Sequence, residues 1–146
     1  PSPPTPALRI GCINIDAHFD LRPFVPLPSS GSPFRLAIER GVIAGEHLVE
    51  FGIQSHCNSP ELWDYAAKHC VSIIPFSNLR GRHQAVESFT QSLKKLGILV
   101  DQIVISLDLD AAAECYAPGV SAPQSEGFTS SDLIEMMEIA GRNPQV

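Results

Sequence analysis

Two short clusters of metal-ligating side chains stand out in the sequence. The first consists of Asp16, His18 and Asp20, which alternate with apolar residues. The second consists of Asp108 and Asp110, on either side of a leucine. In an extended chain alternate side chains share a face, so each cluster is expected to present its polar groups together. Carboxylates and one imidazole in this pattern are suited to holding divalent metal ions.

Four carboxylates in one place require a compensating charge. Without a cation they would repel one another and take up protons. A pair of divalent ions removes the conflict, because carboxylates can bridge two metals. Oxygen ligands with one imidazole and no thiolate favour manganese or another hard divalent ion over structural zinc. Calcium is an alternative on the basis of the oxygen ligands, although a histidine ligand argues against it.

Each cluster alone has an ordinary alternative. The first could be a polar strand end followed by a solvated loop, and the second could be a simple turn. The two together favour the metal interpretation, because each directly follows a run rich in Ile or Val.

These runs are two of four predicted strands. Short apolar runs predict buried strands over residues 8–15, 47–53, 71–75 and 102–107. Within the second strand we expect Val49, Phe51 and Ile53 to share one face.

Helical patterns lie between the strands. We expect a helix over 34–40 that is closed by Gly41, and a second from Ser59 to near His69. A third helix is expected over 82–96 and is stopped by Gly97. A fourth should begin after Thr129, which with Asp132 forms a variant capping box. The third should bury Val86, Phe89, Leu93 and Leu96, and the last should bury Leu133, Ile134, Met137 and Ala140.

The alternation of strands and helices predicts the fold class. It favours βαβ units in an α/β domain, with a mainly parallel sheet covered by helices on both faces. The 146 residues suit one domain, which we place at 8–146 after a disordered, Pro-rich lead-in at 1–7. Ligands of such sheets bind at the carboxyl ends of the strands, where both clusters lie.

Composition excludes several classes of function. The formal net charge of -6 argues against nucleic acid as a partner. We find no apolar run long enough to span a bilayer and no signal-peptide pattern. None of the four cysteines forms a C-x-x-C pair, so we expect reduced structural thiols in a cytoplasmic protein.

Longer stretches around the clusters resemble a known family. Residues 14–22 (NIDAHFDLR) resemble the DAHxD segment of the ureohydrolases, the superfamily of arginase and agmatinase. Residues 106–110 (SLDLD), followed by 117–123 (APGVSAP), are similar to the SxDxD segment and the Pro-Gly loop of that family. The resemblance covers the chain after its Pro-rich start. It implies an arginase-like three-layer α/β/α fold.

Within the superfamily, the formimidoylglutamase branch is most similar. Residues 16–22 (DAHFDLR) and 29–35 (SSGSPFR) look like segments of that branch. Arginases carry a proton-transferring histidine at the position of Phe34, and formimidoylglutamases resemble this chain in lacking it. The resemblance implies a manganese-dependent enzyme that hydrolyses N-formimidoyl-L-glutamate to L-glutamate and formamide, a late step of histidine degradation.

The resemblance also implies roles for the two clusters. Asp16 and Asp108 would bridge two Mn²⁺ ions, Asp20 would complete one site, and His18 and Asp110 would complete the other. The attacking group would be a metal-bridging hydroxide, with no further catalytic side chain.

The amidine substrate would need partners outside the metal centre. Arg22 and Arg35 are candidates for its carboxylates, because a guanidinium offers a bidentate fork. Their alternative is a surface ion pair, which contributes little. Ser30 could bind the amino-acid end of the substrate or simply shape a turn. Among the other histidines, His56 is the one expected near a strand end.

Two parts of the family pattern have no counterpart here. The family uses another histidine ligand upstream of the first cluster and a substrate-binding glutamate downstream of the second, which Glu135 and Glu138 do not match. We therefore expect a partial domain. Two alternatives stay open: another ureohydrolase, such as an agmatinase or guanidinobutyrase, or a catalytically incompetent fragment or assembly subunit. Family members often form homo-oligomers, so a homo-oligomer is a further alternative for this protein.

Overall fold

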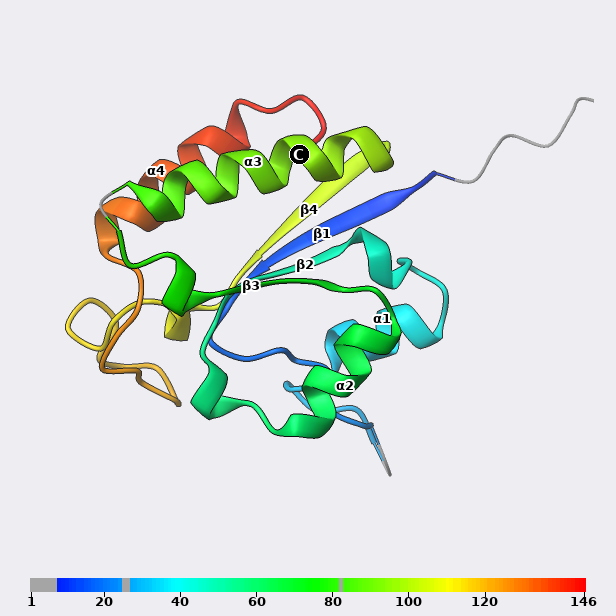
Figure 1. Ribbon diagram of the computed structural model, residues 1–146, viewed down its shortest axis with the longest axis horizontal. Helices are drawn as coiled ribbons and strands as arrows, with labels where there is room; N and C mark the ends of the chain where they lie inside the picture. Colours follow the sequence, from blue (N-terminus) through cyan, green and yellow to red (C-terminus); the bar gives the residue numbers. More distant parts are fainter. Residues whose placement is uncertain (1–7, 25–26, 82) are drawn as a thin grey trace, which may run out of the picture.

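Four apolar segments form a parallel sheet that carries helices on both faces (Figure 1). The computed structural model describes residues 8–24, 27–81 and 83–146, so the expected lead-in at 1–7 lies outside the described residues. In chain order the main elements are β1 (Ile10–Ile15), α1 (Pro33–Glu39), β2 (Leu48–Ile53), α2 (Pro60–Lys68), β3 (Ser72–Pro75), α3 (Gln84–Leu99), β4 (Gln102–Leu107) and α4 (Ser130–Gly141).

The order of the strands brings the two acidic clusters together. The sheet runs β3-β2-β1-β4, so β1 lies between β2 and β4. Ile15 at the end of β1 pairs with Leu107 at the end of β4. The backbone N–H of Asp108 then donates to the carbonyl of Ile15, at 3.0 Å. Asp16 and Asp108 therefore leave the sheet side by side.

The predicted three-layer α/β/α class is confirmed. Ile13 and Ile15 point to the face covered by α3 and α4, where they join an apolar cluster with Phe89 and Met136. Cys12 lies on the opposite face of β1, in a second cluster covered by α1 and α2 (Figure 1). Among the described residues, no helix combines the length and the apolar character needed to cross a bilayer.

One predicted strand face is wrong because of a bulge at Gly52. Val49 and Phe51 pack under α3 and α4 as expected, but Ile53 packs in the cluster on the other face. The register between β2 and β3 shifts between Phe51 and Ile53, where Gly52 adopts a φ of 94°. An extra residue in a strand reverses the faces of those that follow.

Two helix predictions also require correction. Helix α3 buries the predicted apolar face but continues past Gly97 to Leu99. The lack of a side chain at Gly97 leaves room for Gln145, whose amide donates to the carbonyl of Gly97 at 3.0 Å. In α4 the predicted capping box is present, but Met136 is buried and Ile134 is 61% exposed. Leu133, Met136 and Ala140 form the stripe that faces the sheet.

Candidate metal centre

Both clusters lie in turns just beyond the strands. The chain bends at Asp16, and Asp20 adopts a left-handed φ of 52°. Asp108 caps a short 3-10 turn by accepting a hydrogen bond from the backbone N–H of Asp110, at 3.0 Å. The predicted extended alternation is therefore wrong in both segments, since each turns immediately after its strand.

The turns nevertheless bring the five side chains to one place. Asp16, His18 and Asp110 each offer a ligand atom, and these atoms lie within 4.8 Å of one another. Nδ1 of His18 is 3.0 Å from Oδ2 of Asp110 and 3.5 Å from Oδ1 of Asp16. Asp20 and Asp108 line a pocket of about 220 Å³ together with His18 and Asp110. The arrangement offers four carboxylates and one imidazole.

The charges of this group are in conflict without a metal. Burial, followed by repulsion from Asp16 and Asp108, raises the pKa of Asp20 to about 7. Burial also raises the pKa of Asp16. Hydrogen bonds to Asp110 and Asp16 raise the pKa of His18 to about 10, so His18 is the cation that holds the carboxylates together. A donor set of oxygens with one imidazole fits hard divalent cations, which would relieve the repulsion.

Replacing Asp20 by asparagine is expected to stabilise the metal-free protein at neutral pH. The pKa of Asp20 is higher in the folded protein than in the unfolded chain, so its contribution to stability is present below about pH 4 and lost as the pH rises to about 7. Asp20→Asn should raise the free energy of unfolding by about 1 kcal/mol at pH 8, after allowance for partial exposure, and change it little at pH 4. Urea unfolding in the presence of a chelator measures both values. A loss of stability at pH 8 would contradict the repulsion described here.

Sequence reasoning missed three buried polar residues around the centre. Asn58 holds the first cluster: it accepts from the N–H of Phe19 at 3.0 Å and donates to the carbonyl of Ala17 at 2.9 Å. Asn14 and Glu50 lie within β1 and β2 and are almost fully buried. A polar residue inside an apolar strand was the available signal for the latter two. Asn58 stands in a polar turn, where nothing in the sequence distinguishes it.

The three predicted substrate residues lie in different environments. Arg22 and Ser30 line the same pocket as the acidic side chains. Arg22 passes so close to Gly31 that a Cβ there would be 2.9 Å from its Cδ. Arg35 does not line this pocket: its Nε donates to Glu39 at 2.8 Å, and its guanidinium stacks over Tyr65, at 4.3 Å from the ring centre.

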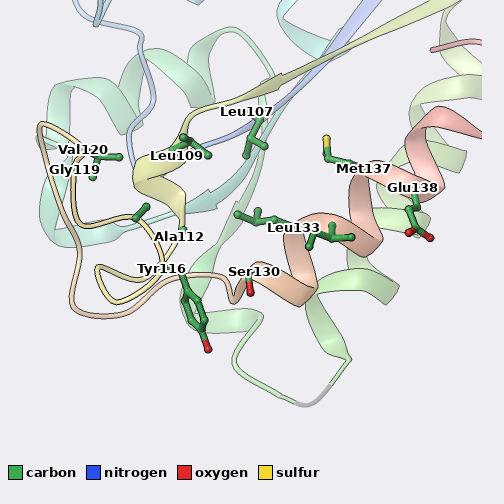
Figure 2. Close-up of a pocket in the computed structure, with 12 residues that line it drawn as sticks. Leu107, Leu109, Ala112, Tyr116, Gly119, Val120, Ser130, Leu133, Met137 and Glu138 are labelled. Atoms are coloured by element: carbon green, nitrogen blue, oxygen red, sulfur yellow. The ribbon is translucent and has the colours of Figure 1, made fainter.

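Two other features lie apart from the candidate metal centre. His56 follows β2, but its ring pairs with the side-chain oxygen of Gln124 at 3.1 Å. A larger pocket of about 730 Å³ lies between the end of β4 and α4, lined by apolar side chains such as Leu107, Leu133 and Met137 (Figure 2). Its one ionisable carboxyl group, on Glu138, cannot hold a metal alone, so this pocket is not a candidate metal centre.

Comparisons with known proteins agree with this geometry. The sequence profile of the arginase family matches residues 7–146. Formimidoylglutamase from Halalkalibacterium halodurans is 35% identical over 138 residues, which cover 94% of this chain and 43% of that protein. The crystal structure of formimidoylglutamase from Bacillus subtilis matches with a TM-score of 0.89 at 30% identity, over 94% of this chain and 43% of that one. Formiminoglutamase from Trypanosoma cruzi, in a structure with two Mn²⁺ ions, matches with a TM-score of 0.81 at 28% identity, over 93% of this chain and 45% of that one. The chain thus spans less than half the length of these relatives.

Proposed function

The chain belongs to the arginase family, and from this premise we propose that the whole protein is a manganese-dependent hydrolase of a linear amidine. The proposed reaction converts N-formimidoyl-L-glutamate and water to L-glutamate and formamide. The observation that carries the proposal is the meeting of two acidic clusters at the adjacent ends of β1 and β4. The similarity to formimidoylglutamases supports the choice of substrate.

The ligands of two Mn²⁺ ions would come from both strand ends. In our assignment Asp16 and Asp108 would serve both ions, Asp20 would complete one site, and His18 and Asp110 would complete the other. The close approach of Asp16, His18 and Asp110 supports the second site. When bound, the two ions would supply an activated water for attack on the formimidoyl carbon. Metal binding would require His18 to give up the proton that it shares with Asp110.

Arg22 is our candidate for a substrate carboxylate. It lines the pocket of the acidic cluster, and a guanidinium binds a carboxylate through two parallel hydrogen bonds. Ser30 lines the same pocket and offers a hydroxyl for the amino-acid end of the substrate. Arg35 is also a proposed contact, and it would have to leave Glu39 and Tyr65, which engage its guanidinium, to bind a substrate carboxylate.

Turnover by the whole protein tests the proposed choice of substrate. Turnover should be compared on N-formimidoyl-L-glutamate, agmatine and arginine in the presence of Mn²⁺. We expect measurable release of glutamate and none of urea. Arg22→Met should raise the KM for N-formimidoyl-L-glutamate more than it lowers kcat, because the substitution removes a contact made before and during the reaction. A preference for agmatine would contradict the proposal.

The bridging assignment makes a separate prediction. Asp108→Ala should weaken Mn²⁺ binding more than Asp110→Ala does, because a bridging carboxylate serves both ions. Isothermal titration with MnCl₂ measures both affinities, and we expect a difference of about tenfold or more. Asp108→Asn is the control for loss of the cap, since asparagine can still accept the hydrogen bond from the N–H of Asp110 that caps the 3-10 turn. Equal losses for the two alanine variants would count against bridging.

A further inference from the structure

A buried polar pair lies directly behind the metal centre. Asn14 on β1 is 1% exposed, Glu50 on β2 is 0% exposed, and the two are register partners. Nδ2 of Asn14 lies 3.0 Å from Oε2 of Glu50 and 3.4 Å from Oδ2 of Asp16. The amino group of Asn14 has two hydrogens, so it can donate one to each carboxyl group.

Stability alone does not explain this pair. Asn14 and Glu50 point to the face of the sheet whose neighbouring positions hold Cys12 and Leu48, in an apolar cluster. Burying an amide and a carboxyl group is costly unless each polar atom is hydrogen-bonded. Among the described residues, Oε1 of Glu50 has no hydrogen-bond partner. A pair of apolar side chains would fill the same space without this cost.

We propose that Asn14 and Glu50 are positioning residues that orient the carboxylate of Asp16 for metal binding. A carboxamide can be turned either way round, and the acceptor on Glu50 selects the orientation in which the amino group faces both carboxyl groups. The reverse orientation would place the carbonyl oxygen of Asn14 against them. This inference rests on the proposed metal centre, in which Asp16 serves both ions.

The carboxylate of Asp16 is then held from both sides. Its Oδ2 faces the amino group of Asn14, and its Oδ1 accepts from the backbone N–H of His18 at 2.7 Å. Partners of this kind fix the direction in which a ligand presents its oxygen atoms, and removing them typically weakens metal affinity by about 10–100-fold. In this proposal Glu50 acts through Asn14, its hydrogen-bond partner.

Four variants of the whole protein test the proposal. Asn14→Leu removes the donor while keeping the number and branching of the non-hydrogen atoms, and Glu50→Met removes the acceptor that orients it. Glu50→Gln is the matched control, because its amide oxygen can still accept from Asn14. The double variant Asn14→Leu/Glu50→Met asks whether the two residues act through one route. Each protein is titrated with MnCl₂ by calorimetry, and its thermal midpoint is measured without metal.

The expected results differ from those of a purely structural role. Asn14→Leu and Glu50→Met should each weaken Mn²⁺ affinity by about 10–100-fold, with no matching fall in the metal-free thermal midpoint. Glu50→Gln should bind Mn²⁺ as the unaltered protein does, and the double variant should bind no more weakly than Asn14→Leu. Unchanged Mn²⁺ affinity in Asn14→Leu, or a loss in Glu50→Gln as large as in Glu50→Met, would overturn the proposal. Should Asn14→Leu fail to fold, Glu50→Met and Glu50→Gln decide between the same outcomes.

A second measurement separates this inference from the proposed function. Crystal structures of metal-free Glu50→Met and Glu50→Gln show the rotamer of Asp16 directly. We expect the Asp16 carboxylate to turn in Glu50→Met and to keep its place in Glu50→Gln. If the unaltered whole protein bound no Mn²⁺, the proposed function would fail, yet the position of Asp16 in these crystals would still support or overturn the positioning role. An unmoved Asp16 in Glu50→Met would overturn it.

Discussion

Asp16→Asn should all but abolish manganese binding while leaving the metal-free protein folded. Asp16 is 2% exposed and lies where the two acidic clusters meet. Asparagine keeps the shape of the side chain and can still accept the hydrogen bond from the N–H of His18. It loses the charge, and with it one proposed ligand of both ions. We expect Mn²⁺ affinity to fall by more than about 100-fold, a larger loss than removal of an outer partner causes.

Asp16→Asn should weaken Mn²⁺ binding, but it should not destabilise the metal-free protein. Burial raises the pKa of Asp16, so its charge is unfavourable in the metal-free fold. Asp16→Asn should therefore unfold at an equal or higher temperature than the unaltered protein in chelator, and should gain little when MnCl₂ is added. Asp64→Asn on the exposed side of α2 is the matched control and should change neither quantity. Tight Mn²⁺ binding by Asp16→Asn would remove Asp16 from the ligand set.

Gly52→Ala should destabilise the fold strongly. The φ of 94° at Gly52 is unfavourable for alanine, at a cost of about 1–2 kcal/mol. The new Cβ would also lie 2.5 Å from Cε2 of Phe128, a ring stacked on Phe51 and packed edge-on against Phe76. Overpacking of this kind costs a further 1–3 kcal/mol or so. Urea unfolding measures the total.

Gly41→Ala provides a matched control for Gly52→Ala. Gly41 also has a positive φ, of 68°, but a Cβ there would meet no atom within 4 Å. The loss of stability in Gly41→Ala should be limited to the backbone cost of about 1 kcal/mol. The difference between the two variants then measures the clash with Phe128. Equal losses would show that the bulge in β2 can move, in contradiction to the packing described here.

The fold could be predicted because its signals are local. Each strand is a short apolar run, and a parallel sheet places the carboxyl ends of neighbouring strands together. That rule places Asp16 and Asp108 at the same edge of the sheet, and the strand order then brings them side by side. The helical period of the apolar residues likewise located α3, and the capping box at Thr129 located the start of α4. What failed depended on contacts distant in sequence: the room that Gly97 leaves for Gln145, and the bulge at Gly52 under Phe128.

The site was only partly predictable for the same reason. The ligand-type residues were visible because their side chains alternate with apolar ones over a few positions. The roles of Asn58 and Glu50 depend on partners 41 and 36 residues away, Ala17 and Asn14. The pairing of Arg35 with Glu39 and Tyr65 also required the placement of α1 against α2.

Diffraction from crystals grown with MnCl₂ tests the central claim most directly. Anomalous scattering from manganese locates each ion without reference to activity. We expect two peaks at the adjacent ends of β1 and β4, both in contact with Asp16 and Asp108, one beside Asp20 and the other beside His18 and Asp110. Manganese bound elsewhere on the molecule, with these five side chains left without an ion at saturating concentration, would contradict the account.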